Sequence, residues 1–249
     1  MAQFPAQPTD PQFKAKYGID APGVIRNLFL GGIAFAAVAL FFPLIKIGSV
    51  DIDTHGLYWS AGGCTLGGLL MLLYSLFGKF KHRDRMLRLA GDWTGNEQVL
   101  DVGTGRGLLM IGAAKKLITG KSTGTDIWNA EDLSGNNVQH AINNTIAEGV
   151  YAKTEILNDN AMSMSFADSS FDVILTNQVI HNIYNKEGRK KACHEIARVL
   201  KPGGVAVISD FRHMKDYKKT FDELGLETKM HPADYLTTFP ALDILVVRK

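Results

Sequence analysis

The stretch that decides the fold is Val99-Leu-Asp-Val-Gly-Thr-Gly-Arg-Gly-Leu-Leu-Met110. Its first four residues form an apolar run typical of a buried strand, and the leucines at its end indicate the start of a helix. Gly103, Gly105 and Gly107 allow a tight turn between the two, with no Cβ to keep a ligand away from the backbone. The free N–H groups at the start of the helix would face the same point. The pattern therefore predicts a site for a small anionic or zwitterionic ligand.

The spacing of the glycines separates two cofactor classes. The dinucleotide fingerprint G-x-G-x-x-G would place its third glycine at position 108, but position 108 is Leu and the glycine is Gly107. The pattern Asp101-x-Gly-x-Gly-x-Gly107 resembles motif I of the class I S-adenosylmethionine (SAM) dependent methyltransferases. That resemblance implies a seven-stranded Rossmann-like fold and SAM as the cofactor.

Composition excludes several classes of protein. The 249 residues carry 27 basic and 25 acidic side chains, whereas nucleic-acid-binding domains usually have a marked basic excess. Cys64 and Cys193 are the two cysteines, and neither stands in a Cys/His spacing that ligates metals. We expect two buried free thiols, no metal site and no nucleic-acid partner.

The N-terminal third differs from the rest of the chain. Residues 1–22 contain four prolines and predict a flexible tail. Leu28–Ile45 and Leu57–Gly78 contain no charged residue, and each is close to the roughly 20 apolar residues that a membrane-spanning helix needs. Both runs are apolar all round, unlike a surface helix of a soluble protein. Residues 23–78 therefore predict a two-helix transmembrane hairpin, with a buried hairpin of a soluble protein as the alternative.

Two further features describe this hairpin. Lys and Arg residues precede the first helix and follow the second, whereas the linker Lys46–Gly56 between the helices carries one Lys and two Asp. Both termini and the domain that follows should therefore be cytoplasmic. Residues 79–90 form a basic juxtamembrane linker or helix, lying against anionic head groups or simply solvated. Small residues would let the two helices approach closely; they are Gly31, Gly32, Ala36 and Ala37 in the first run and Gly62, Gly63, Gly67 and Gly68 in the second.

Residues 91–249 alternate short β-rich runs with amphipathic stretches, which predicts an α/β domain with a doubly wound, mostly parallel sheet. The last two strand runs have no helix between them, so they should form an antiparallel hairpin at the sheet edge. Predicted strands are Gln98–Val102, Thr123–Ile127, Lys153–Leu157, Val173–Thr176, Val205–Ser209, Glu227–Met230 and Leu242–Val247. Predicted helices are Leu108–Ile118, Ser134–Glu148, Lys186–Leu200 and Lys215–Leu224.

Asp126 lies near the end of the second predicted strand, 25 residues after Asp101. A carboxylate there can accept both ribose hydroxyls of an adenosine, and a helix N-cap or turn is the alternative. Ile127 and Trp128 offer flat apolar surface for an adenine ring, although Trp128 could equally pack on the next helix.

Residues 159–176 resemble the family's segment Gly-Asp-Ala-x-x-Leu-Pro-Phe-x-Asp-x-Ser-Phe-Asp, aligned through Ala161 and Phe171. The family's adenine-contacting Asp falls on Asn160, whose amide oxygen can still accept a hydrogen bond. Asp159 could take the role if the loop shifts by one residue. Glu195–Ser209 also resembles the family, as a helix, a Pro-Gly stop and a strand.

The segment after the fourth predicted strand bears on the substrate. Amino-group methylases carry Asn-Pro-Pro-Tyr or a variant here, whereas this chain has Asn177-Gln-Val-Ile, which disfavours nucleic-acid bases and glutamine as acceptors. The segment is more similar to small-molecule, quinone or lipid methyltransferases. His181 is the candidate general base, because histidine ordinarily titrates near neutral pH; a structural or surface histidine is the alternative.

The resemblance spans roughly residues 95–249 and implies a SAM-dependent methyltransferase. The predicted hairpin lies outside it, and the two together indicate a membrane-anchored enzyme acting on a small, lipophilic acceptor. Alternatives are a SAM-binding membrane protein without transfer activity, or an enzyme for a soluble metabolite or protein side chain in which the hairpin only anchors. A nicotinamide-dependent oxidoreductase is opposed by the glycine spacing. The implied cofactor contacts are Asp101, Gly103, Thr104, Gly105, Gly107, Asp126, Ile127, Asp159, Asn160, Ala161 and Asn177.

Overall fold

The computed structural model describes residues 14–128 and 137–249. The chain divides into two compact units. Residues 19–78 form the first, and residues 79–249 together with the described residues before 19 form the second. The division falls at Gly78 and Lys79, between the apolar hairpin and the α/β domain.

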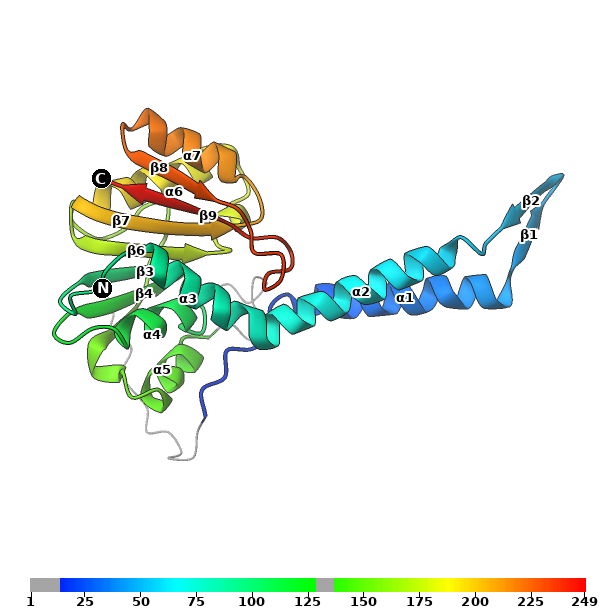
Figure 1. Ribbon diagram of the computed structural model, residues 1–249, viewed down its shortest axis with the longest axis horizontal. Helices are drawn as coiled ribbons and strands as arrows, with labels where there is room; N and C mark the ends of the chain where they lie inside the picture. The colour runs from blue at the N-terminus through cyan, green and yellow to red at the C-terminus, as the bar shows by residue number, and fades with distance from the viewer. Residues whose placement is uncertain (1–13, 129–136) are drawn as a thin grey trace. The chain divides into compact units, whose positions relative to one another are not determined.

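The first unit is a helical hairpin (Figure 1). Its two helices pack side by side, and a small antiparallel β-hairpin that the sequence did not suggest joins their ends. The elements are α1 (Pro22–Phe41), β1 (Leu44–Ile47), β2 (Val50–Asp53) and α2 (Leu57–Leu73), followed by a π-helical turn over Tyr74–Gly78.

Small residues bring α1 and α2 together at two levels. A Cβ on Gly32 would lie 2.6 Å from Thr65 Oγ1, and one on Gly68 would lie 3.2 Å from the Phe29 ring. Gly62 and Gly63 would have nothing within 4 Å of an added Cβ, so they take no part in this packing. Close approach thus depends on Gly32 and Gly68 among the small residues expected to provide it.

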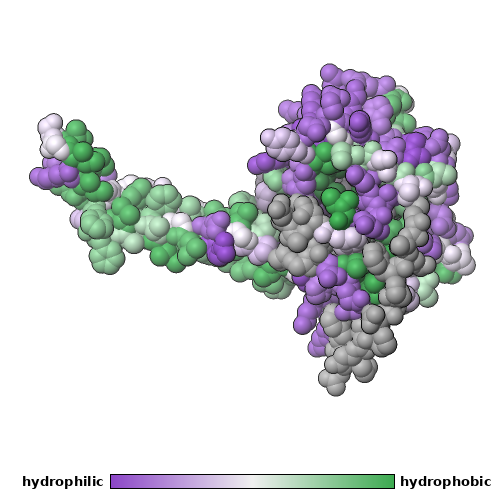
Figure 2. All heavy atoms as spheres, turned by 180° about the vertical axis from the view of Figure 1, so that it is seen from behind, coloured by the Kyte–Doolittle hydropathy of each residue, from purple (hydrophilic) through white to green (hydrophobic). Residues whose placement is uncertain are grey.

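Two continuous helical stretches, Pro22–Phe41 and Leu57–Leu89, are by length and composition long and apolar enough to cross a membrane, and the second runs through α2, the π-helical turn and α3. Little of the apolar part of either is buried inside the protein. Hydrophobic side chains cover much of the narrow hairpin unit in the space-filling view (Figure 2). Leu40 and Phe41 are among the exposed ones. Cys64 on α2 is also partly exposed, so the expectation that both cysteines are buried holds for Cys193 and is wrong for Cys64.

In the described part of the second unit, seven strands form one sheet in the order β5-β4-β3-β6-β7-β9-β8 (Figure 1). All pair in parallel except β9, which runs antiparallel to both β7 and β8. The predicted doubly wound sheet with its C-terminal antiparallel hairpin is therefore confirmed. The strands are β3 (Gln98–Val102), β4 (Lys121–Asp126), β5 (Thr154–Asn158), β6 (Phe171–Asn177), β7 (Leu200–Asp210), β8 (Glu227–His231) and β9 (Asp243–Arg248).

Helices cover both faces of the sheet because its central strands are apolar on both faces. Leu100 and Ile174 face one cluster with α6 and α7, whereas Val99 and Val173 face another with α3 and α4. The helices are α3 (Lys79–Leu89), α4 (Leu108–Ala114), α5 (Val138–Ala147), α6 (Lys186–Val199) and α7 (Met214–Glu223).

Two helices are shorter than expected. The helix after the glycine-rich turn ends at Ala114, since the N–H groups of Ile118, Thr119 and Gly120 all donate to the carbonyl of Gly95. α5 begins at Val138, where Asn137 Oδ1 accepts from Gln139 N as an N-cap. The first residues of that predicted helix, 134–136, lie outside the described residues.

Residues 79–89 form a helix, as one of the two alternatives expected over residues 79–90, but helix α3 is not separate from the α/β domain. Met86 and Leu87 are buried against the sheet. His82 is also buried, with Nε2 2.7 Å from Ser209 Oγ, near the carboxyl end of β7. Helix α3 ends before β3, which starts at the amino edge of the sheet. Its first residues therefore lie at the carboxyl edge.

The expected flexible tail also needs correction over residues 16–18. Lys16 N donates to Asn144 Oδ1 at 2.8 Å, and Tyr17 Oη donates to Glu148 Oε1 at 3.0 Å. Lys79 Nζ donates to the carbonyls of Tyr17 and Gly18. These bonds bind the segment before the hairpin to α3 and α5 of the domain. The rest of the predicted tail, residues 1–13, lies outside the described residues.

Candidate functional site

The glycine-rich turn joins β3 to α4, and a buried carboxylate holds it. Asp101 Oδ2 accepts from Thr104 Oγ1 at 2.8 Å and from Met110 N at 2.9 Å. Gly103, Gly105 and Gly107 all have positive φ, as the turn requires. Asp101 and Thr104 therefore shape the turn from beneath.

Gly103 is also the point where a second loop closes on the turn. A Cβ at this position would overlap the Cγ2 methyl group of Val179. Val179 follows β6 and immediately precedes the short 3₁₀-helix Ile180–Asn182. The absence of a side chain at Gly103 thus allows the loop that carries His181 to lie against the glycine-rich turn.

We expect Gly103→Ala to lower the free energy of unfolding by about 2–4 kcal/mol, since it combines a strained positive φ with a clash against a stiff β-branched side chain. Urea unfolding of the full-length protein measures this change. Gly149→Ala is the matched control, because Gly149 has φ +69° and nothing within 4 Å of an added Cβ. Equal destabilisation in the two variants would show that the Val179 contact contributes nothing.

Asp101 is an ionisable group in an apolar place. Its side chain is buried, and burial raises its pKa to about 7, although the hydrogen bonds from Thr104 and Met110 oppose the shift and the charge of Asp126 adds to it. The folded protein therefore binds a proton at Asp101 across a pH range in which the unfolded chain has lost it.

This shift has a definite sign. Between about pH 4 and pH 7 the folded state holds one more proton than the unfolded state, so stability falls as the pH rises. Asp101→Asn removes the titration, and the variant should gain in Tm relative to the wild type from pH 5 to pH 7.5. Thermal unfolding across this range without ligand measures the difference. A difference in Tm that is constant with pH would contradict the prediction.

Asp126 lies at the carboxyl end of β4, next to the glycine-rich turn. Its Oδ2 accepts from Gly105 N at 2.9 Å and its Oδ1 from Trp128 N at 2.8 Å, while its carbonyl accepts from Asp159 N at 3.3 Å. One residue thus joins the turns after β3, β4 and β5. The bond from Trp128 N to Oδ1 is the turn role that was the alternative for Asp126, and its role as a ribose acceptor stays a prediction.

The two candidates for adenine recognition are both tied into their own loop. Asn160 Oδ1 accepts from Met162 N at 2.9 Å. Asp159 accepts from Asn160 N through Oδ1, and from Ser165 N and Oγ through Oδ2. Ala161 packs against the apolar cluster beneath. These side chains shape the loop after β5, so their roles toward adenine stay predictions.

Ile127 and Trp128 differ in what they offer. Ile127 is 58% exposed beside Asp126, so it presents an apolar surface at the carboxyl edge. Trp128 packs against the cluster formed by α4 and α5. Of the two interpretations of Trp128, the structure supports packing on the next helix.

His181 is paired with an acid that sequence reasoning missed. Its Nδ1 lies 2.8 Å from Oδ1 of Asp210, a carboxylate buried at the end of β7, and its ring meets Phe211 edge-on at 4.6 Å between centroids. His181 N also donates to Asp210 Oδ2 at 3.2 Å. Asn177, at the end of β6, pairs with Ser209 in register. An acid directly after a buried strand was the available signal for Asp210.

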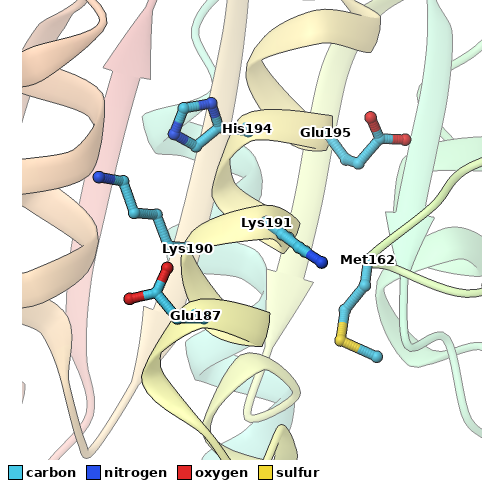
Figure 3. Close-up of a pocket in the computed structure, with 6 residues that line it drawn as sticks. All are labelled: Met162, Glu187, Lys190, Lys191, His194 and Glu195. Carbon is cyan, nitrogen blue, oxygen red and sulfur yellow. The ribbon is translucent and has the colours of Figure 1, made fainter.

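A hollow on the surface lies away from these residues, between α6 and the loop after β5 (Figure 3). Figure 3 shows Lys191 and Glu195 turned toward Met162, with Lys190 and His194 on the other side of the helix. Glu195 is bound to Arg198 at 2.8 Å. None of the predicted site residues lines this hollow, so it is no part of the candidate site.

Among the described residues, no group of three His, Cys, Asp or Glu side chains could hold a metal ion.

Comparison with known proteins agrees with this geometry. Residues 100–208 match the family model described as "Methyltransferase domain". The chain is 32% identical over 125 residues to the ubiquinone/menaquinone biosynthesis C-methyltransferase UbiE of Hydrogenovibrio crunogenus, covering 50% of this chain and 46% of that protein. It is 31% identical over 147 residues to the sterol 4-C-methyltransferase strm-1 of Caenorhabditis elegans, covering 59% and 40%. The chain thus spans less than half the length of these curated relatives.

Solved structures show the same fold. A SAM-dependent methyltransferase from Aquifex aeolicus superposes with a TM-score of 0.52 at 18% identity, covering 66% of this chain and 88% of that one. The phosphoethanolamine N-methyltransferase 2 of Haemonchus contortus, solved with SAM, superposes with a TM-score of 0.55 at 15% identity, covering 68% and 52%.

Proposed function

We propose that this chain, whose residues 100–208 form a SAM-dependent methyltransferase domain, is a membrane-anchored enzyme that methylates a small lipophilic acceptor. In this proposal residues 23–78 span the membrane twice, and both termini and the domain are cytoplasmic. The acceptor reaches the site from the bilayer.

One observation carries the proposal. The residue directly after the apolar hairpin is Lys79, the first residue of α3. Helix α3 begins at the carboxyl edge of the sheet, where the turns after β3 and β4 and the loop of His181 lie. Ligands of open α/β sheets bind at this edge. The chain therefore leaves the domain toward its apolar hairpin from the edge that carries the candidate site.

The residues at this edge fit the cofactor. SAM joins an adenosine to a zwitterionic methionine, so it needs acceptors for ribose hydroxyls and a backbone that a ligand can approach. The Asp126 carboxylate supplies the acceptors, and the turn from Gly103 to Gly107 supplies the approach. Ile127 provides an exposed apolar surface beside them. Asp159, Asn160, Ala161 and Asn177 lie on the neighbouring loops as further predicted contacts.

SAM supplies an electrophilic methyl group bound to a sulfonium. An acceptor O–H, S–H or C–H group that attacks this methyl would form a bond to the methyl carbon while the methyl–sulfur bond breaks and its electron pair stays on the sulfur, and the acceptor would lose a proton. His181 is the proposed base for that proton, because it lies on the loop that closes on the glycine-rich turn and its Nδ1 is 2.8 Å from Oδ1 of Asp210. Asp210 is a positioning residue in this scheme.

The substrate class is supported by the names of similar proteins. One of these proteins is named for the biosynthesis of ubiquinone and menaquinone, and another is named as a sterol methyltransferase. Both kinds of molecule are apolar and dissolve in membranes. An apolar anchor that enters the domain at the edge of the site suits an acceptor of this kind.

The test uses the full-length protein in nanodiscs, supplied with methyl-labelled SAM and with host membranes plus cytosolic extract. Products are separated into organic, aqueous and protein fractions. The expected result is label in the organic fraction with the wild type and no label with Asp126→Ala. Label confined to the aqueous or protein fraction would overturn the lipophilic acceptor, and SAM binding without any labelled product would overturn the transferase.

A further inference from the structure

The loop between β8 and β9 presents two large apolar side chains to the outside. Tyr235 is 78% exposed and Leu236 is 97% exposed. A leucine left in water forgoes the free energy that burial of its side chain would provide. Exposed apolar side chains that stand next to one another often mark a contact surface.

The exposure of these side chains is built into a compact turn. Asp234 Oδ1 accepts from Leu236 N at 3.1 Å and its Oδ2 from Thr237 Oγ1 at 2.8 Å. The carbonyl of Asp234 accepts from Thr237 N and Thr238 N. Thr238 is itself buried. The turn therefore holds Tyr235 and Leu236 outward.

The turn lies at the carboxyl edge of the sheet. β9 runs antiparallel to β7 and begins where β7 ends, with Asp243 opposite Asp210 (Figure 1). Ala233 N donates to Asp243 Oδ1 at 2.9 Å, and Arg85 Nη2 of α3 donates to the Pro232 carbonyl at 2.8 Å. The exposed pair thus stands at the edge from which α3 leads back to the hairpin.

Positive charge flanks the turn. Hydrogen bonds from Thr237 and Leu236 hold the pKa of Asp234 below its usual range, and the nearby cations of Arg85 and Lys81 lower it further. The Asp234 carboxylate lies in the turn itself, beside the two cations of Lys81 and Arg85. An apolar tip that includes a tyrosine, with Lys and Arg beside it, is typical of a segment at the interface of an anionic membrane.

We infer that the turn of Tyr235 and Leu236 inserts into the head-group region of the cytoplasmic leaflet and holds the carboxyl edge of the domain against the bilayer. This inference rests on the proposed membrane anchor. A bilayer is preferred to a protein partner for two reasons. The flanking cations complement anionic lipid, and the chain enters α3 at this edge directly from an apolar hairpin.

The test measures how deep a spin label lies in nanodiscs of phosphatidylcholine and phosphatidylglycerol. Labels are placed by Leu236→Cys, by Ile118→Cys and by Phe35→Cys in the full-length chain with Cys64→Ala, since Cys193 is buried. Ile118 is the matched control, because it is 74% exposed and lies at the opposite edge, where its N–H donates to Gly95 just before β3. Phe35 on α1 reports the anchor itself.

Power saturation compares collisions with oxygen, which enters lipid, and with a water-soluble nickel chelate. The expected result is an oxygen-to-nickel ratio several-fold higher at 236 than at 118, and highest at 35. A high ratio at 35 with equal ratios at 236 and 118 would overturn this inference alone, whereas an aqueous ratio at 35 would overturn the anchor as well. Spin–spin broadening at 236 that disappears on dilution with unlabelled protein would assign the turn to a second copy instead of lipid.

Discussion

Asp126→Ala is expected to weaken SAM binding by about a hundredfold. A hydrogen bond to a charged group contributes about 1.5–3 kcal/mol, so losing two acceptor oxygens for the ribose costs about 3 kcal/mol or more. Asp126 also accepts from Gly105 N and Trp128 N, which adds disorder of the cofactor turn to the loss. Isothermal titration of the full-length protein in detergent with SAM measures the change in Kd.

Asp168→Ala is the matched control for this experiment. Asp168 lies in the segment that resembles the methyltransferase family, but its side chain is exposed and bound to Arg198 at 2.8 Å, so its removal should leave the Kd for SAM unchanged. Asp126→Asn retains one acceptor oxygen and should fall between the wild type and Asp126→Ala. An unchanged Kd in Asp126→Ala would contradict its placement in the cofactor site.

His181→Gln is expected to lower kcat by about 10²–10³-fold with little change in the Kd for SAM, because positioned general-base catalysis contributes about this much. The measurement is the rate of label transfer into the organic fraction from host membranes. His194→Gln is the control, since His194 is an exposed histidine on α6 at the hollow away from the site. Equal rates for His181→Gln and the wild type would assign His181 a structural role.

Asp210→Asn should lower kcat in the same assay and leave the KM for SAM unchanged. The amide retains the shape of the side chain but loses the charge that lies 2.8 Å from Nδ1 of the neighbouring imidazole. Asp210 also accepts from His181 N and Phe211 N, so circular dichroism must confirm that the variant is folded. A rise in the KM for SAM with unchanged kcat would contradict a role through His181.

The fold was predictable because its signals are local in the chain. An apolar run such as Val173–Thr176 indicates a buried strand. The Pro-Gly pair before Val205 separates the preceding helix from the apolar run of the next strand. β3 coincides with its prediction at Gln98–Val102. β7 extends to Leu200–Asp210, beyond the apolar core of the run, because it pairs with both β6 and β9. The neighbouring strands decide where a strand ends, and the apolar run of one strand does not reveal which strands those are.

The candidate site was predictable where one loop carries it. Gly103 to Gly107 and Asp126 were recognisable because a turn after a strand needs those residue types at that spacing. The residue that contacts adenine was harder to predict, because Asn160 and Asp159 both accept hydrogen bonds from their own loop. A side chain's hydrogen-bond partners depend on where the loop folds back, and the order of residues does not give that.

The sequence by itself determined that this protein has an apolar helical hairpin and a seven-stranded methyltransferase-like sheet, since hydrophobic period and glycine spacing act over a few residues. Only the tertiary structure decided that Asp210 stands 2.8 Å from His181. It also decided that α3 belongs to the domain and that Tyr235 and Leu236 stand at the edge where α3 begins. These contacts join residues that are tens of positions apart in the chain. They exist because β7 pairs with β6 on one side and β9 on the other, and only the assembled sheet brings those strand ends together.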